Sequence, residues 1–162
     1  MMVLDLSFAS IMSFLAIMAL LLIYSVLDYR DRRVTNEFVI IGGIVGGIIL
    51  ILTGHFTSNI VLHLTALLFV VPLAYILFRL GSIGGADAKV LVVLSFVSPG
   101  VELVICDEPV LEAIIALGWE LVVMLLGGYF YWRVRKKNEA STPPLIPFLL
   151  VGYLALQVIA VF

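Results

Sequence analysis

The sequence has 162 residues and a formal net charge of −2; 64% of the residues are hydrophobic, only 12% are charged, and the mean hydropathy is +1.26. A soluble globular domain carries about 25% charged residues, so this composition excludes one and indicates an integral membrane protein. Backbone groups in lipid must be hydrogen-bonded within the protein, which leaves a helix bundle or a closed barrel. The apolar runs are long and continuous instead of alternating, so we predict an all-α, polytopic bundle.

Six segments are candidate membrane spans, since a span needs about 20 predominantly apolar residues. They cover residues 8–27, 38–52, 60–80, 88–105, 111–132 and 145–162. Pro99-Gly100 interrupts the fourth. Its helix either stops near Ser98, with the turn at 84–87 dipping into the membrane, or continues as a kinked helix to Ile105. Every loop is short, so we expect a single domain over residues 1–162.

The charged residues predict the orientation. All nine lysines and arginines fall in alternate loops, and the intervening loops carry none. The basic residues are Arg30, Arg32, Arg33, Arg79, Lys89, Arg133, Arg135, Lys136 and Lys137, and the acids of the intervening loops are Glu102, Asp107, Glu108 and Glu112. By the positive-inside rule the basic loops are cytoplasmic and both termini lie outside, as six crossings require.

The segment 81–89, GSIGGADAK, places an ionisable side chain between two strongly apolar segments. A carboxylate so close to hydrocarbon, here Asp87, is costly unless it is solvated, paired or neutralised. The small residues Gly84, Gly85 and Ala86 leave room for another backbone or for water to approach it. Asp87 is therefore a candidate functional residue.

A second carboxylate, Asp28, follows the first apolar run and is predicted at the same membrane face as Asp87. If their helices are neighbours, the two can share a proton and a water, and such a pair can work as acid and base in hydrolysis. The pair titrates as a unit, so the sequence does not say which is the acid. Alternatively, both are ordinary helix-end charges paired with Arg30 or Lys89.

Three segments resemble motifs of a known family. They are 28–36 (DYRDRRVTN), 84–89 (GGADAK) and 144–148 (PLIPF). They are similar to the Asp-x-Arg…Ile-Pro-Asn, GxGDxK and C-terminal Pro-Phe segments of the archaeal prepilin and preflagellin (prearchaellin) peptidases. Those enzymes are membrane aspartic proteases related to bacterial type IV prepilin peptidases. The resemblance covers essentially the whole chain and implies that Asp28 and Asp87 are catalytic, with Gly84, Gly85, Ala86 and Lys89 supporting the site.

The chain departs from the family pattern at two positions. Ala86 stands where the second glycine of GxGD is expected, and alanine still leaves the backbone approachable. Thr35 stands where proline usually precedes Asn36, and either Thr35 or Asn36 can cap the helix that follows. Asp31 is a rival for the first aspartate, but it lies three residues further from the membrane than Asp28.

The resemblance implies substrates that are precursors of type IV pilin-like or archaellum subunits. These are cut between a short basic leader and an apolar helix, on the cytoplasmic side of the cell membrane. Asp31 and Glu37 are candidates for contacting the leader. The bacterial relatives carry an extra methylating domain with paired cysteines; this chain has one cysteine, Cys106, and is expected to cleave without N-methylating.

Other polar residues have two interpretations each. Lys89 either favours the ionised form of Asp87 or only follows the positive-inside rule. Glu120 lies inside the fifth span. It either has a functional role, as a polar group near the substrate or in a proton path, or it is a protonated side chain that hydrogen-bonds to a neighbouring helix; we favour the second interpretation. His55 and His63 have no third ligand at suitable spacing, so we expect no metal site. We also expect no cofactor and no nucleic-acid partner.

Four glycines, Gly42, Gly43, Gly46 and Gly47, form two overlapping GxxxG patterns in the second span. This spacing lets another helix pack closely, either within the bundle, which we favour, or as the helix of a substrate.

A different class of function, a small ion- or proton-coupled transporter or channel subunit, would use the two carboxylates to bind a cation or relay protons. It lacks support, because the sequence has no inverted repeat and both carboxylates are predicted at one face.

Overall fold

A computed structural model describes residues 3–4, 7–31, 34–135 and 143–161 of the chain. Within these residues the elements are β1 (Val3–Leu4), α1 (Phe8–Asp31), α2 (Asn36–Thr53), α3 (His55–Ser58), α4 (Ile60–Arg79), α5 (Gly85–Val97), β2 (Val104–Ile105), α6 (Pro109–Arg135) and α7 (Ile146–Val161). The predicted helical fold is confirmed. The two short strands form one antiparallel pair, with Val3 opposite Ile105 and Leu4 opposite Val104. Arg32, Arg33, Lys136, Lys137 and the last residue of the sixth predicted span, Phe162, lie outside the described residues.

Four helices, α1, α2, α4 and α6, are long and apolar enough to cross a membrane, and α7 is a shorter apolar helix of 16 residues. The protein is therefore a polytopic helical membrane protein. Helix α1 continues four residues beyond the predicted end of the first span, through Asp31. Asp28 consequently lies inside the last turns of this helix, not in the loop after it.

For the fourth predicted span, residues 88–105, the first of the two alternatives is confirmed: the helix stops beside Ser98 and does not continue to Ile105. Helix α5 begins at Gly85 and ends at Val97, and the backbone N–H of Ser98 makes the last helical bond, to the carbonyl of Leu94. Pro99 follows, and proline disfavours helical geometry in the residue before it. The kinked helix that would have reached Ile105 does not form, because that residue belongs to β2. With 13 residues, α5 is only about 20 Å long, shorter than a hydrocarbon core of about 30 Å.

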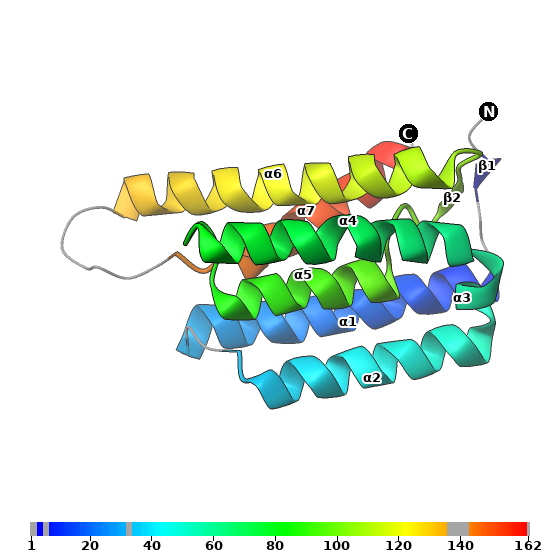
Figure 1. Ribbon diagram of the computed structural model, residues 1–162, viewed down its shortest axis with the longest axis horizontal. Helices are drawn as coiled ribbons and strands as arrows, with labels where there is room; N and C mark the ends of the chain where they lie inside the picture. Colours follow the sequence, from blue (N-terminus) through cyan, green and yellow to red (C-terminus); the bar gives the residue numbers. More distant parts are fainter. Residues whose placement is uncertain (1–2, 5–6, 32–33, 136–142, 162) are drawn as a thin grey trace.

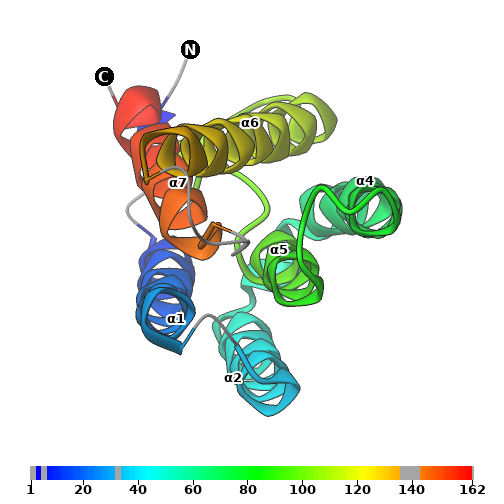
Figure 2. The same cartoon turned by 90° about the vertical axis from the view of Figure 1, so that its left-hand side faces the viewer.

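Helix α5 lies inside the bundle, which explains how so short a helix is accommodated. Figure 2, a view along the bundle, shows α1, α2, α4, α6 and α7 around it, with α2 and α4 on its two sides. The side chains of Val90, Leu91, Leu94 and Val97 are almost completely buried. The outer helices instead expose many large apolar side chains, as a surface facing lipid requires.

The two ends of the bundle carry opposite charge. One end holds the C-terminal ends of α1, α4 and α6 and the N-terminal ends of α2, α5 and α7 (Figure 1). The described basic residues lie near these helix ends, and we call this the basic end. β1, β2, α3 and the C-terminal end of α7 lie at the opposite end (Figure 1), together with the acids of the segment 102–112; we call it the acidic end. The separation of charge follows the predicted topology. Which end faces the cytoplasm stays a prediction.

Candidate active site

Asp28 connects α1 to the start of α7. Its side chain is 7% exposed, and Oδ2 accepts a hydrogen bond from the backbone N–H of Ile146, at 3.2 Å. Ile146 is the first residue of α7, so this N–H has no partner within its own helix. The N-terminal end of a helix also carries partial positive charge, which favours a negative carboxylate there. Asp28 thus caps a helix that begins 118 residues later in the chain.

Asp87 lies in the first turn of α5 and is 9% exposed. Its Oδ2 accepts a hydrogen bond from the backbone N–H of Gly84, at 3.0 Å. A Cβ atom on Gly84 would lie only 2.9 Å from this oxygen, so the absence of a side chain there lets the carboxylate fold back over the helix start. The turn before it needs glycine as well, because Gly81 has φ of +73°.

The two carboxylates line the same cavity. It has a volume of about 480 Å³ and lies at the basic end, between the start of α5 and the start of α2. Its lining comes from all three segments that resemble the family motifs and from Pro143, which directly precedes the third: Asp28, Val34, Thr35, Asn36, Gly84, Gly85, Ala86, Asp87, Pro143 and Pro144. Two carboxylates buried beside one cavity are costly to ionise together, so a pair of this kind favours holding one proton between them.

The residues predicted to support the site have distinct positions. Gly84, Gly85 and Ala86 line the cavity beside Asp87. Lys89 instead turns towards α2, where its Nζ donates a hydrogen bond to the side-chain oxygen of Asn36. This bond ties the start of α5 to the start of α2. Thr35 occupies the N-cap position of α2, but its side chain makes no capping hydrogen bond, so side-chain capping by this residue is a wrong prediction.

Asp31 and Glu37 are at the basic end but do not line the cavity. The side chain of Asp31 is 56% exposed, and its Oδ1 lies 3.8 Å from Nε of Arg30, which is itself exposed. Glu37, in the first turn of α2, is also exposed. Asp28, and not Asp31, therefore shares the cavity with Asp87. A role for Asp31 and Glu37 in contacting a leader stays a prediction.

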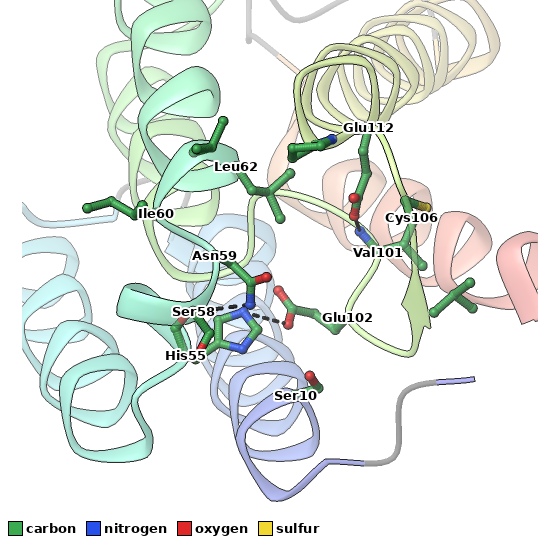
Figure 3. A pocket seen from close by; sticks show the side chains of 13 residues that line it. Ser10, His55, Ser58, Asn59, Ile60, Leu62, Val101, Glu102, Cys106 and Glu112 are labelled. Atoms are coloured by element: carbon green, nitrogen blue, oxygen red, sulfur yellow. Dashed lines mark hydrogen bonds and ion pairs between the residues drawn. The ribbon is translucent and has the colours of Figure 1, made fainter. Parts of the chain in front are cut away.

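Sequence reasoning missed a second polar cluster, at the acidic end (Figure 3). His55 and Glu102 are both buried, and His55 Nε2 lies 3.2 Å from Glu102 Oε2. The ring of His63 stands edge-on to that of His55, with centroids 5.5 Å apart. A cavity of about 250 Å³ adjoins this cluster. His55 and Glu102 lie far apart in the sequence without a recognisable spacing, so no local pattern could have predicted their contact.

Two side chains hold the loop that carries Glu102. Glu112 accepts a hydrogen bond from the backbone N–H of Val101 at 2.8 Å. Gln157 accepts one from the N–H of Glu102 at 3.0 Å and donates one to the carbonyl of Gly100 at 3.1 Å. Among the described residues, no group of three or more His, Cys, Asp or Glu side chains is placed to hold a metal ion. The loop that carries Glu102 is thus tied by hydrogen bonds to α6 and α7.

Glu120, in the middle of α6, is buried in the bundle interior as predicted, and it does not line the cavity of Asp28 and Asp87. Within the part of the chain that the structure describes, its Oε2 has no hydrogen-bond partner. The predicted hydrogen-bonded contact is therefore not made by this oxygen.

The fold and the cavity define a membrane-embedded helical protein with paired carboxylates at one end. The model of the type IV leader peptidase family matches residues 15–161, a range that includes both aspartates and all three motif segments. The chain belongs to this family, and the predicted resemblance is confirmed at that level. A member of this family is a membrane-embedded peptidase of the prepilin-processing type. Comparison with curated proteins and with solved structures gives no match.

Proposed function

We propose that the protein is a membrane aspartic endopeptidase that removes the short basic leader from precursors of type IV pilin-like or archaellum subunits. The observation that carries this proposal is the shared cavity of Asp28 and Asp87. Asp28 accepts a hydrogen bond from the backbone N–H of Ile146, and Asp87 accepts one from the backbone N–H of Gly84. Both keep a path to the cavity, where a peptide bond and a water can meet them.

The reaction needs one ionised and one protonated aspartate. The ionised aspartate removes a proton from a water, whose oxygen attacks the carbonyl carbon of the scissile peptide bond. The protonated aspartate donates a hydrogen bond to the carbonyl oxygen, and a proton then passes to the leaving nitrogen as the C–N bond breaks. A pair of carboxylates in one cavity supplies both the ionised and the protonated form at the same pH, because the negative charge on one carboxylate makes ionisation of the other unfavourable.

The position of the cavity suits a substrate with a basic leader and an apolar helix. The basic end carries the excess of lysine and arginine and is cytoplasmic by the positive-inside rule. A precursor helix lying in the bilayer beside the bundle would bring its leader to this end. The exposed carboxylates of Asp31 and Glu37 are the proposed contacts for the leader, because a largely basic face cannot attract it by net charge.

We further propose that cleavage is not followed by N-methylation. The methylating domain of the bacterial relatives is an insertion with paired cysteines, and this chain has a single cysteine, Cys106.

The test is cleavage of a tagged type IV pilin precursor, co-expressed with the protein and followed by immunoblot of the membranes. We expect Asp28→Asn and Asp87→Asn each to abolish cleavage while the amount of protein in the membrane is unchanged, because asparagine is nearly isosteric but cannot act as acid or base. Asp107→Asn, at an exposed aspartate of the acidic end, is the matched control and should cleave normally. Near-full cleavage by either of the first two variants would disprove the aspartic mechanism.

A further inference from the structure

A long apolar groove lies on one side of the bundle, between α2 and α4, with α5 as its floor. Its volume is about 1130 Å³, and its lining is almost entirely apolar. Along α2 it extends from Asn36 to Ile51, which corresponds to about 22 Å of helix at 1.5 Å per residue. This length matches roughly four turns of a helix lying beside the bundle.

The groove meets the cavity of the two aspartates. Asn36 and Gly85 line both spaces. Lys89, which is hydrogen-bonded to Asn36, also lines the groove at this junction. A chain segment that follows the groove towards the basic end therefore arrives beside Asp28 and Asp87.

We propose that this groove, defined by α2, α4 and α5, is the docking site for the apolar helix of the substrate. The inference rests on the proposed function and specifies how the substrate is positioned. A peptidase that cuts next to an apolar helix must hold that helix so that the bond reaches the carboxylates. A groove that ends at the cavity does so directly, whereas the binding of lipid or of a second copy would not require that continuity.

The surface of the groove suits helix packing in lipid. There, apolar burial alone gives no preference for a helix over lipid, and close approach of backbones supplies the attraction. Gly43 lines the groove and is only half-buried, and a Cβ on it would make an ordinary contact with Val93, at 3.4 Å, so a helix can approach the α2 backbone at this point.

Gly42 and Gly46 of α2 pack against other helices of the bundle instead of lining the groove. A side chain on Gly42 would overlap Tyr24 of α1, and one on Gly46 would overlap Val97 of α5. The pair Gly42/Gly46 therefore packs within the bundle, as the sequence favoured. Gly47 is also buried, against Phe96 of α5, which leaves Gly43 as the glycine of this group that is available to the proposed partner.

Photo-crosslinking from α2 tests this docking site. Ile44 lines the groove and Ile41 does not, although each is 57% exposed. A photoreactive phenylalanine analogue is placed at one or the other position in the Asp87→Asn background, which retains the precursor uncut, and a tagged type IV pilin precursor is co-expressed. We expect severalfold more enzyme–precursor product from position 44. Equal yields, or a product at position 44 that contains only a second copy of the enzyme, would overturn the inference.

A cleavage assay supports the same test without the photoreactive group. Ile44→Trp and Val71→Trp narrow the groove from its two sides and should slow cleavage of the precursor severalfold. Ile41→Trp and Leu68→Trp, on exposed faces of the same helices outside the groove, should cleave as the unmodified protein does. If the unmodified protein does not cut the precursor at all, the proposed function is wrong and the docking site falls with it. If it cuts and the groove variants cut equally well, only the docking site is wrong.

Discussion

The bundle buries ionisable side chains at both ends, and the two sets differ in one respect. At the basic end the neighbours are two acids, Asp28 and Asp87, which line one cavity. At the acidic end the neighbours are an acid and a base, Glu102 and His55, 3.2 Å apart. Unlike groups can satisfy each other, so the second pair serves the fold. Two acids cannot satisfy each other. To be buried together they need a shared proton, a backbone donor or water, and these are also the components of acid–base catalysis.

Neutralising one carboxylate at each end tests this difference most strongly. Asp28→Asn should lower the rate of precursor cleavage by about a thousandfold or more, because general acid–base catalysis contributes at that level. Glu102→Gln should leave the rate within about twofold, since the cluster at the acidic end is remote from the chemistry. Both are measured in purified membranes at equal enzyme content. A large loss of cleavage rate in Glu102→Gln would show that the cluster at the acidic end is also needed for catalysis.

For stability we expect the opposite order: the variant at Glu102 should be more harmful than the variant at Asp28. Glu102→Ala removes one partner of a buried pair and should lower the free energy of unfolding by about 3 kcal/mol. Asp28→Asn should cost much less, because an amide oxygen can still accept the N–H of Ile146 and the repulsion between two acids is relieved. Unfolding in mixed micelles with increasing sodium dodecyl sulfate measures both. A more damaging Asp28→Asn would mean that the dyad is mainly structural.

The pH dependence of cleavage should be bell-shaped, because the reaction needs one proton on the pair. At low pH both aspartates are protonated and no base is present, so the rate rises about tenfold per pH unit until the first proton leaves. At high pH both are ionised and no acid is present, so the rate falls with the same slope. Substitution of His55 should leave both the rising and the falling side of this pH profile at the same pH values. A single-sided profile would indicate only one essential group.

Glycine at position 84 should matter for positioning. In Gly84→Ala the new Cβ would press on Oδ2 of Asp87, and a small displacement of this carboxylate should slow cleavage about fivefold. The backbone at this position is extended, so alanine itself causes no conformational strain. Gly85→Ala is the matched control, because its Cβ would meet only Phe78 at 3.4 Å. Equal rates in the two variants would contradict the positioning role.

The smallest effect is expected where the chain departs from the family pattern. Ala86→Gly restores the second glycine of GxGD and should change the rate by no more than about twofold, since alanine already leaves the cavity open. It should also lower stability by up to about 1 kcal/mol, because glycine is unfavourable inside a helix. A large gain in rate would show that Ala86 restricts the site.

Much of the fold was predictable because lipid imposes it. Apolar runs fixed the positions of α1, α2, α4, α6 and α7 to within a few residues, and the alternation of charge sorted the loops to two ends. That sorting also put Asp28 and Asp87 at one end before any packing was known.

The contacts that shape the site could not be predicted in the same way. The bond from Ile146 to Asp28, the turn of Lys89 towards Asn36 and the pair of His55 and Glu102 all depend on how helices pack side by side. The end of α5 was one of two alternatives that Pro99-Gly100 left open, and only the structure shows that the shorter helix forms and is covered by its neighbours in the bundle.

The most direct test of the central claim is the cleavage rate of the double variant Asp28→Asn/Asp87→Asn beside those of the two single variants. If the two carboxylates act as one unit, either single change already removes the function and the double variant is no slower than the singles. If the two losses multiply, or if one single variant cleaves at a near-normal rate, the aspartates do not work as a pair and the account is contradicted.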